Sequence, residues 1–377
     1  MLFQTGFRMN FLQSNKWVNN LFRILYFLRR GWNNFIGHGL ELKDVFSEFH
    51  KNMWLDAASK LSVDIKSYSG GFYKATFKGR STWIVDYRVE IDNYVVLQVA
   101  RNKPLVSKIL SENGIAVPAF HSFMINNIES AKKFLNSQQA PCVVKPALDG
   151  AGGQGVTTHI KSSLELKRAA IFASVFCHTV MIERLIFGDV YRLLFLNGEL
   201  LDTIRRFPPQ VIGDGYSTIR NLINKENKRM IEQSGFLSLK VLLIDVDCRM
   251  TLRRSGLSLK DVPKKGQTIT IKSTTNESGA NDCESVINIV NDEIVTECRR
   301  AASVLGIKLA GVDIITSNIE APLKQTGGKI IEINAIPGLH YHYQVRNSKE
   351  MVPVAVPILS SLLNINKTER IDLANNK

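Results

Sequence analysis

The sequence predicts an α+β protein built from two or three lobes. Its 377 residues are more than one ordinary core accommodates, because domains usually run to about 100–200 residues. Short stretches in which apolar and polar residues alternate, as they do in half-buried strands, are interspersed with stretches of helical periodicity. Glycine pairs and an Asn-Gly turn separate several of the strand-like stretches, which is typical of antiparallel hairpins.

The composition is that of a globular protein. Hydrophobic residues make up 45% and charged residues 22% of the chain, and no apolar run reaches the roughly 20 residues that span a bilayer. The five cysteines are widely spaced and form no C-x-x-C pair. We therefore expect a protein of the reducing cytoplasm that neither spans a membrane nor contains a structural zinc.

The chain is strongly basic, which favours anionic partners. Lysine and arginine outnumber aspartate and glutamate 48 to 34, giving a formal net charge of +14. Nucleotides, acidic peptides, nucleic acid and anionic lipid all fit this charge. Nucleic acid is disfavoured, because the sequence shows no platform of arginine and aromatic residues of the RNA-binding type.

Residues 1–45 read as a basic amphipathic segment, in which no acid precedes Glu41. Apolar residues recur there at helical spacing: Trp17, Leu21, Phe22, Leu25 and Leu28. The pattern predicts a helix packed on the body of the protein. Contact of residues 1–40 with a membrane surface or a partner is the alternative.

A small N-terminal lobe is expected over residues 46–98. From about residue 60 onward, apolar and polar residues alternate, and Gly70-Gly71 and Gly79 mark turns between the strand-like stretches. We therefore predict a small α/β or β-rich lobe.

Helices and strands alternate from residue 99 to about residue 206. A helix over about 104–113 is expected to end at Asn113-Gly114, where glycine can adopt the left-handed cap conformation. Asn197-Gly198 predicts a tight hairpin between the last two strands of this part. The other expected elements are helices near 129–136 and 163–174 and strands at "CVVK", "GVTTHI", "TVMIER", "YRLLFL" and "ELLDTI".

The remainder of the chain continues this alternation. "STIRNLINKENKRM" predicts a helix, and a longer helix over about 289–305 precedes the strands "KLAGVDIIT" and "GGKIIEIN". "MVPVAVPILSSLL" predicts a closing helix, and residues 367–377 are expected to form a disordered tail.

The stretch "VVKPALDGAGGQGV", residues 143–156, contains a glycine pattern that fits two phosphate-binding motifs poorly. A dinucleotide fold needs a helix after the glycines, but "VTTHI" consists of β-forming residues. A P-loop needs lysine where Val156 stands. What remains is a glycine-rich hairpin whose backbone N–H groups could cover phosphates, with a plain surface hairpin as the alternative.

Five segments in order resemble the ATP-grasp superfamily, and within it the ATP-grasp module of cyanophycin synthetase and related glutathione-type ligases. They span about residues 100–360, roughly two thirds of the chain. The segments are "NKPLVSKILSENGIAVP", "CVVKPALDGAGGQGV", "MIERLIFGDVYRLLFLNGELL", "IRRFPPQVIGDGYSTIRNLI" and "AGVDIITSNIEAPLKQTGGKIIEINAIPGLHYH".

The resemblance implies an ATP-grasp domain over residues 99–366, made of two α/β lobes that grip ATP, with a lid lobe at about 115–184. It also implies an ATP-dependent carboxylate–amine ligase: ATP phosphorylates a carboxylate, an amine attacks the acyl phosphate, and an amide, ADP and phosphate are released. Residues 46–98 would then correspond to the lobe that precedes the ATP-grasp domain.

Nucleotide-binding roles follow from the matched positions. Lys103 and Lys145 match the two lysines that bind the ATP phosphates, and Lys145 lies mid-strand, where a charge needs a partner. Glu183 matches the carboxylate beside the adenine and ribose. The expected backbone contacts of the hairpin loop with the phosphates are Gly152, Gly153 and Gly155.

One departure from the family pattern concerns the ribose. Relatives usually have an acid directly before an aromatic-Arg pair, whereas Val190 precedes Tyr191 and Arg192 here. Either Asp189 substitutes from one position earlier, or the ribose is held less tightly.

A site for Mg²⁺, with Mn²⁺ as the alternative, is expected on two neighbouring strands. Glu332 and Asn334 are two residues apart and therefore project from one face, while Ile331 and Ile333 point the other way. A turn could bring Asp313 alongside them. Three oxygen donors suit a hard cation that completes its shell with water and phosphate.

The expected catalytic groups are cationic. Arg192, Arg205 and Arg206 are candidates to stabilise the transferring phosphoryl group and the developing oxyanion. Arg205 and Arg206 are adjacent on a strand, so at most one of them is expected to reach the γ-phosphate. His342 is a candidate to bind a substrate carboxylate or to assist amine deprotonation, with a purely structural role as the alternative.

The function predicted from the sequence is therefore that of an amide-forming ligase. Its substrates would be amino acids or short peptides, at least one of them acidic, and a homo-oligomer is left open. One alternative is a peptide-modifying ligase whose basic surface recruits an acidic peptide. The other is a catalytically weak nucleotide-binding or membrane-docking protein, an alternative favoured by Val190.

Overall fold

The computed structural model describes residues 38–148, 153–232, 242–275, 282–366 and 369. The expected helix within residues 1–37 and most of the expected tail lie outside these residues. The chain divides into two compact units, residues 1–41 with 119–185 and residues 42–118 with 186–377. None of the described helices combines the length and the apolar character needed to span a bilayer.

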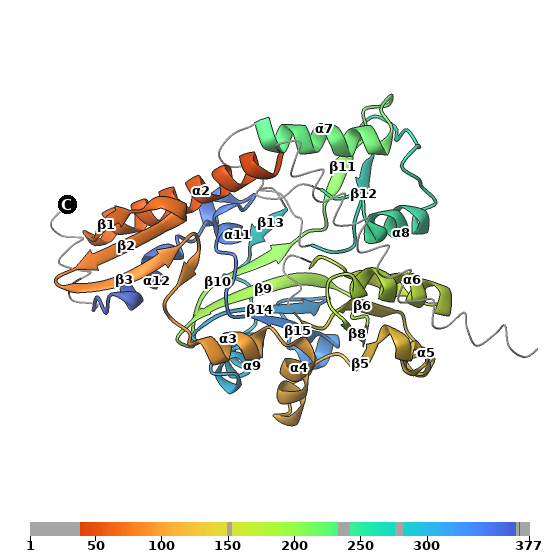
Figure 1. The fold of residues 1–377 in the computed structure, drawn as a ribbon, viewed down its shortest axis with the longest axis horizontal. Helices are drawn as coiled ribbons and strands as arrows, with labels where there is room; N and C mark the ends of the chain where they lie inside the picture. Colours follow the sequence, from red (N-terminus) through yellow and green to blue (C-terminus); the bar gives the residue numbers. More distant parts are fainter. Residues whose placement is uncertain (1–37, 149–152, 233–241, 276–281, 367–368, 370–377) are drawn as a thin grey trace, which may run out of the picture. The chain divides into compact units, whose positions relative to one another are not determined.

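The described part of the first unit is a sheet of four antiparallel strands covered by two helices (Figure 1). The strand order is β5 (Phe120–Met124), β8 (Thr179–Arg184), β6 (Cys142–Pro146) and β7 (Thr157–Ile160). The helices are α5 (Ile128–Ser137) and α6 (Ser163–Ser174). Helix α6 begins with a capping box between Ser162 and Glu165, which satisfies backbone N–H groups of its first turn.

The second unit is built on a five-stranded antiparallel sheet. The strand order is β13 (Cys283–Ser285), β10 (Glu199–Arg206), β9 (Asp189–Leu196), β14 (Leu309–Thr316) and β15 (Lys329–Asn334). Strands β9 and β10 form the hairpin expected at Asn197-Gly198, whose φ angles of 49° and 81° are the left-handed values that such a turn needs.

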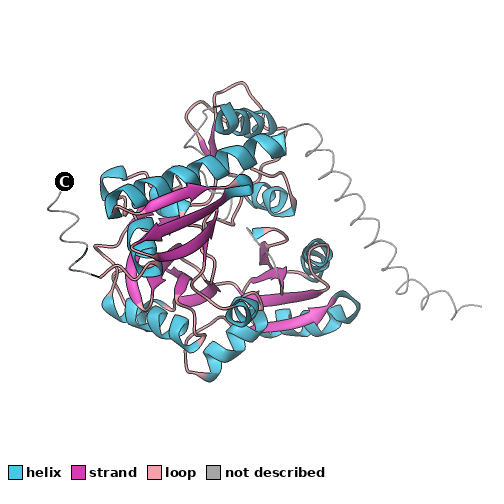
Figure 2. Ribbon diagram, turned by 60° about the vertical axis from the view of Figure 1, so that its left-hand side comes forward, coloured by secondary structure: helices cyan, strands magenta, loops and turns pink. Residues whose placement is uncertain are grey.

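One face of this sheet is apolar. Tyr191, Leu193 and Ile314 belong to a buried cluster that also includes side chains of α4 (Lys103–Glu112) and α9 (Asp292–Val304). The short helix α3 (Tyr94–Ala100) contributes partly buried side chains to the same cluster. Figure 2 colours the helices of the protein cyan and its strands magenta.

A bulge in β15 changes which side chains reach that apolar cluster. Asp313 pairs with Glu332 but Ile314 pairs with Ile330, so Ile331 is an extra residue on β15. Ile330 and Ile333 are consequently the buried side chains of this strand, whereas Ile331 is only half-buried. The expectation that Ile331 and Ile333 share the core face was wrong for Ile331, because strict alternation stops at the bulge.

The other face of the sheet is apolar at one end only. There, Leu194, Leu196 and Leu309 pack in a cluster shared with the N-terminal lobe and the closing helix α12 (Ala355–Leu362). The lobe consists of α2 (His38–Leu61) and a sheet in the order β1 (Asp64–Ser67), β2 (Phe72–Phe77), β3 (Arg80–Val85) and β4 (Arg88–Val89). Its fully buried Trp54 donates a hydrogen bond to the Asp86 carbonyl at 2.6 Å.

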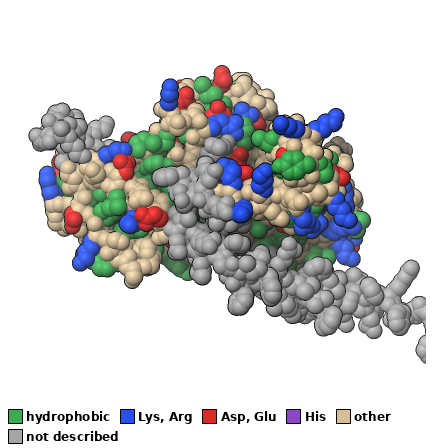
Figure 3. Space-filling view, turned by 90° about the horizontal axis from the view of Figure 1, so that it is seen from above, with side chains coloured by type: hydrophobic (Ala, Val, Ile, Leu, Met, Phe, Trp, Pro, Cys, Tyr) green, Lys and Arg blue, Asp and Glu red, His purple; other side chains and the backbone are tan. Residues whose placement is uncertain are grey.

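Residues 209–275 form a small module within the second unit. It contains β11 (Gln210–Ile212), α7 (Ile219–Glu232), α8 (Val246–Arg254) and β12 (Thr268–Thr270), with β11 and β12 paired antiparallel around their own apolar cluster. Helix α7 was expected, whereas α8 and the two-stranded sheet were not. Figure 3 looks onto the α7 side and shows Lys and Arg side chains on that face. The remaining short elements of the chain are η1 (Ser69–Gly71), η2 (Ile125–Asn127), α10 (Leu323–Thr326), α11 (His340–Tyr343) and η4 (Ser348–Glu350).

Candidate active site

In the first unit, Lys145 and Glu183 form a buried ion pair. They lie on the adjacent strands β6 and β8, where Val143 is opposite Glu183, so the two side chains share one face of the sheet. The Lys145 ammonium donates to the Glu183 carboxylate at 2.7 Å, and the side chains are only 9% and 7% exposed. The carboxylate is the partner that a lysine in the middle of a strand requires.

The glycine-rich loop connects two antiparallel strands, β6 and β7, as a hairpin does. This arrangement differs from the strand–loop–helix of a dinucleotide fold. Gly153 and Gly155 both have φ of 76°. A Cβ at Gly155 would lie 2.7 Å from the Phe176 ring and 2.8 Å from Pro146, so a side chain is excluded there. Gly152 lies outside the described residues.

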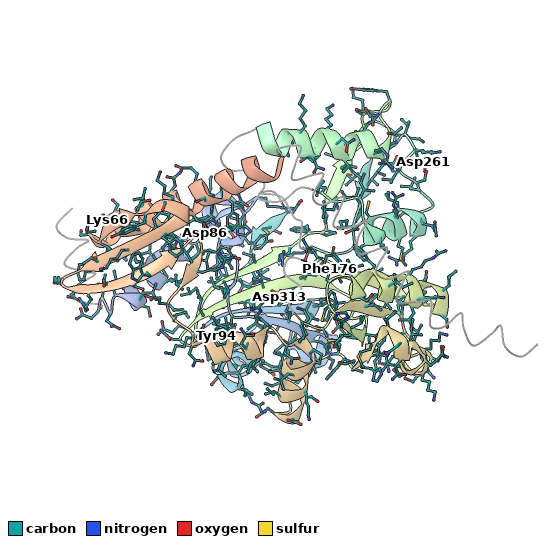
Figure 4. All side chains as sticks on the ribbon, viewed as in Figure 1. Lys66, Asp86, Tyr94, Phe176, Asp261 and Asp313 are labelled. Carbon is teal, nitrogen blue, oxygen red and sulfur yellow. The ribbon has the colours of Figure 1, made fainter. Side chains whose placement is uncertain are left out.

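In the second unit, four charged side chains form a row across the sheet and the start of α4. Arg192, Asp313 and Glu332 are direct cross-strand neighbours on β9, β14 and β15, so their side chains share one face. Asp313 lies near the middle of this sheet (Figure 4). The two carboxylates lie side by side in the middle of the row, and a cation lies at each end: Arg192 on β9 and Lys103 on α4.

The pair of Arg192 and Asp313 is bidentate and buried. The Arg192 Nε and Nη2 atoms donate to the two Asp313 carboxylate oxygens at 2.6 and 2.7 Å. Burial by itself would lower the pKa of Arg192, but the charge and hydrogen bonds of Asp313 raise this pKa above its ordinary value. Arg192 is therefore a permanent cation with a fixed orientation.

Lys103 and Glu332 form the outer pair of the row. Lys103 is the first residue of α4, a helix capped by the Asn102 side chain, which accepts from the Leu105 N–H at 3.2 Å. The Lys103 ammonium lies 3.2 Å from a Glu332 carboxylate oxygen, with the side chains 14% and 27% exposed. This pair is more accessible than the pair of Arg192 and Asp313.

The oxygen donors expected to bind a metal do lie together. Asp313 on β14 pairs with Glu332 on β15, and Asn334, two residues further along β15, pairs with Gly311. The Asn334 amide donates a hydrogen bond to the Asp313 carboxylate at 3.3 Å. Among the described residues, no group of three or more His, Cys, Asp and Glu side chains is placed to hold a metal. Two carboxylates and one amide nevertheless fit Mg²⁺, which usually takes one or two carboxylates and completes its shell with water and phosphate.

The register distinguishes Arg206 from Arg205. Arg206 is opposite Val190 and therefore shares the face of Arg192, whereas Arg205 is opposite Tyr191 and shares the apolar face. Arg206 is 3% exposed, donates to the Thr275 carbonyl at 2.8 Å and lies 4.4 Å from the centre of the Tyr341 ring.

Asp189 lies on the same side of the sheet as Arg205. The Arg205 guanidinium donates to Asp189 at 2.7 Å. Val190 occupies the face that carries Arg192 and Asp313. The structure therefore does not bring Asp189 to the position that Val190 fills, and the expected substitution for the missing acid is not seen in this arrangement.

His342 is held by a carboxylate that the sequence reasoning missed. Its Nδ1 lies 2.7 Å from Asp202, and both side chains are fully buried. The other Asp202 oxygen accepts from the Thr203 N–H at 2.8 Å and from the Ser285 hydroxyl at 3.0 Å. Asp202 thus fixes the orientation of the imidazole ring of His342.

A second group of buried charges lies in the module of residues 209–275. The Lys272 ammonium donates to Asp245 at 2.6 Å, with the side chains 2% and 18% exposed. Asp247 accepts from the N–H and the hydroxyl of Ser273 at 3.0 and 2.8 Å, and burial raises the pKa of Asp247. The signal in the sequence was a lysine directly after the β-forming residues "TITI", much as Lys145 follows "CVV".

Comparison with known proteins gives several relatives, although no protein-family profile matches the chain. Cyanophycin synthetase of Trichormus variabilis is 30% identical over 248 residues, which are 65% of this chain and 27% of that protein. Cyanophycin synthetase of Geminocystis herdmanii is 31% identical over 281 residues, 74% of this chain and 32% of that protein. The glutathione biosynthesis bifunctional protein GshAB of Clostridium perfringens is 29% identical over 265 residues, 68% of this chain and 34% of that protein.

One solved structure has a comparable fold. The bifunctional glutathione synthetase from Pasteurella multocida matches with a TM-score of 0.50 and 20% identity, covering 80% of this chain and 41% of that one. At this identity the likeness concerns the fold. The chain spans between 27% and 34% of the length of the three curated relatives above.

Proposed function

We propose, from the premise that the chain is an ATP-grasp protein related to cyanophycin synthetase and to bifunctional glutathione biosynthesis proteins, that it is an ATP-dependent carboxylate–amine ligase. A substrate carboxylate oxygen attacks the γ-phosphorus of ATP, forming an acyl phosphate and releasing ADP. An amine then attacks the acyl carbon, the phosphate leaves, and the amine proton passes to solvent or a base. The proposed substrates are amino acids or short peptides, at least one of them acidic.

The observation that carries this proposal is the row of four charged side chains in the second unit, in which two neighbouring carboxylates lie between two cations. Arg192, Asp313 and Glu332 are cross-strand neighbours, and both carboxylates are already paired with cations. Buried ion pairs contribute little net stability, because the cost of desolvation offsets the attraction. Two neighbouring ion pairs, one buried and one partly exposed, are better explained by a role in binding charged substrates.

Phosphate and nucleotide contacts are assigned to both units. In the first unit, Lys145 would bind phosphate oxygens, Glu183 would bind the nucleoside, and the backbone of Gly153 and Gly155 would cover phosphates. In the second unit, Lys103 would bind phosphate oxygens. Its ammonium is partly exposed and its present partner is a single carboxylate, so it can turn to a stronger anion.

Asp313, Glu332 and Asn334 would hold Mg²⁺ or Mn²⁺. When bound, the cation neutralises phosphate oxygens during phosphoryl transfer. Asp313 keeps its carboxylate oriented by the two hydrogen bonds from Arg192. The binding of a cation would compete with Lys103 for the Glu332 carboxylate.

Stabilisation of the developing negative charge is assigned to Arg192 and Arg206. Both guanidinium groups lie over the Tyr341 ring, at 5.7 and 4.4 Å from its centre, on the face that carries the row of charges. A pre-oriented cation stabilises a transition state without reorganising. Arg205 is not assigned a role in this step, because it lies on the opposite face.

The test is release of ADP with pairs of amino acids or short acidic peptides as carboxyl and amine donors, with the product identified by mass. Glu332→Ala and Lys145→Ala should each lower turnover by two orders of magnitude or more, roughly the loss expected for removing one essential charge contact. Lys324→Ala is the matched control, because Lys324 forms a 2.6 Å ion pair with Glu293 whose side chains are 71% and 59% exposed. Unchanged ADP release in Glu332→Ala and Lys145→Ala would reject the assignment.

A further inference from the structure

The module of residues 209–275 has an excess of positive charge on its surface. It contains twelve lysines and arginines and six aspartates and glutamates, a net charge of +6 in a chain whose net charge is +14. Its acids are largely engaged inside the module: Asp245 and Asp247 are bonded to Lys272 and Ser273. Of the described acids in this module, only Asp261 is exposed. Exposed cations therefore outnumber exposed acids in the described part of the module, and one of these cations, Lys225, lies 3.9 Å from the Asp214 carboxylate.

Two segments of the module, 213–220 and 257–267, lie side by side. The Ile219 N–H donates to the Asp261 carbonyl at 2.9 Å, and the Gly213 N–H donates to the Gln267 carbonyl at 2.8 Å. A Cβ at Gly213 would lie 2.3 Å from a backbone oxygen of the second segment, so the contact fixes the shape of this surface. Figure 4 labels Asp261 in this part of the module.

Several exposed cations belong to these segments and to the adjoining helix α7. We call five of them the basic tip: Arg220, Lys225, Lys260, Lys264 and Lys265.

Exposed apolar side chains accompany these cations. Tyr216 is 74%, Ile212 66% and Val262 48% exposed. The Tyr216 N–H is bonded to the Asp214 carboxylate at 3.2 Å, so the backbone that presents the ring is held in a turn. Exposed apolar side chains among predominantly positive charges are typical of a surface that binds another molecule.

We propose that the basic tip binds an acidic polypeptide and recruits it as a substrate of the ligase; the second half of this statement rests on the proposed function. Four of the five cations are lysines, whose flexible ammonium groups suit the mobile carboxylates of Asp and Glu, whereas planar recognition of phosphate favours arginine. Among the described residues of the module, Tyr216 is the one exposed aromatic ring, whereas single-stranded nucleic acid is bound by a series of stacking rings. The observations therefore favour a peptide over a nucleic acid.

The basic tip belongs to the module that contacts a candidate catalytic residue. The Thr275 carbonyl, at the end of the module, accepts a hydrogen bond from Arg206 at 2.8 Å. The basic tip and the residues of the second unit that are proposed for phosphoryl transfer therefore belong to the same compact unit. A peptide held by the tip would raise the local concentration of its reactive group.

The experiment measures the binding of a fluorescently labelled oligoglutamate peptide to the full chain by anisotropy, at low and at physiological salt. Reversal of three tip charges, Lys260→Glu, Lys264→Glu and Lys265→Glu together, should weaken binding by roughly tenfold or more, with loss of most of the salt dependence. The control reverses three exposed lysines elsewhere in the same unit, Lys66→Glu, Lys108→Glu and Lys349→Glu, which changes the net charge equally. It should change the affinity by no more than about twofold.

Three results would overturn the proposal. They are no binding to the unaltered chain at low salt, equal weakening in the two triple variants, and tighter binding of a single-stranded oligothymidylate that displaces the peptide. ADP release separates this proposal from the proposed function. The tip variant should keep its turnover with free amino acids and show a raised KM for acidic peptides. An unaltered chain that binds the peptide but releases no ADP with any substrate pair would reject the ligase activity and leave the docking surface standing.

Discussion

The two faces of the five-stranded sheet carry opposite chemistry on the same strands. On one face, Tyr191, Leu193 and Ile314 pack into an apolar cluster with α4 and α9. On the other face, Arg192 and Asp313 form a buried ion pair. Arg192 lies between Tyr191 and Leu193 in β9, and Asp313 directly precedes Ile314 in β14. The apolar face gains free energy by excluding water, whereas the charged face costs desolvation. The difference supports the proposal made above, in which the first face stabilises the unit and the second carries its function.

The largest effect is expected from breaking the buried pair. Asp313→Ala leaves the Arg192 cation buried without its carboxylate, which should cost about 3–5 kcal/mol of unfolding free energy and abolish ADP release. The double variant Arg192→Met with Asp313→Leu should recover much of the stability but none of the turnover. Denaturant unfolding and ADP release measure the two outcomes separately. Turnover in the double variant would show that the charged face is not catalytic.

A substitution on the apolar face should separate stability from activity in the opposite sense. Ile314→Ala removes buried methyl and methylene groups next to Asp313 and should cost about 2–5 kcal/mol of unfolding free energy. The rate of ADP release, measured below the unfolding temperature of the variant and normalised to the amount of folded protein, should stay within a few-fold of the rate of the unaltered chain. A loss as large as that of Asp313→Ala would mean that the two faces are not functionally distinct.

The adjacent arginines of β10 compare the faces within one dipeptide. Arg206→Ala should lower turnover by about 10²–10³-fold, the range for removing one pre-oriented group that stabilises transition-state charge. Arg205→Ala removes a partly exposed ion pair with Asp189 and a contact with the Phe207 ring, and it should change turnover by less than about threefold. Steady-state ADP release distinguishes the two variants. A larger loss in Arg205→Ala than in Arg206→Ala would contradict the faces that the strand register assigns to these arginines.

The smallest effect is expected from the residue that supports Arg206 indirectly. Asp247 holds Ser273, and two residues later the Thr275 carbonyl accepts from Arg206. Asp247→Asn should cost about 1–3 kcal/mol of stability, because one buried hydrogen-bonding oxygen is replaced by an amide, and should lower turnover less than Arg206→Ala does. The matched control is Asp261→Asn, an exposed acid of the same module. If the two variants changed thermal unfolding and ADP release equally, the proposal that Asp247 supports the position of Arg206 would be wrong.

Much of this arrangement could be predicted from local pattern. The hairpin at Asn197-Gly198 was predicted because only residues tolerant of positive φ close so short a turn. The antiparallel strands on both sides of the glycine loop were predicted because β-forming residues follow it. The α+β ATP-grasp fold, predicted from the order of five segments, is confirmed by the relatives and by the solved glutathione synthetase.

Other features depended on contacts between distant residues. The bulge at Ile331 inserts one residue into β15, and nothing in the alternation of "KIIEIN" indicates where the register shifts. Asp202 was missed because its partners, Ser285 and His342, are 83 and 140 residues away. The helix α8 was missed because it has only nine residues and its buried face includes the polar Asp247 and Thr251, so that no apolar stripe marks it in the sequence.

The sequence by itself determined the fold class and the identity of the charged residues available for chemistry. Mid-strand charges such as Lys145 and Asp313 signalled partners, because an unpaired charge in a strand interior is too costly. It also determined that Arg205 and Arg206 face opposite ways, since side chains alternate along a strand. Only the tertiary structure decided which of them shares the face of Arg192, and that Asp189 faces away from it. The physical reason is that alternation along one strand fixes only which of its side chains share a face. The pairing of β9, β10, β14 and β15 decides whether that face is the charged one or the apolar one.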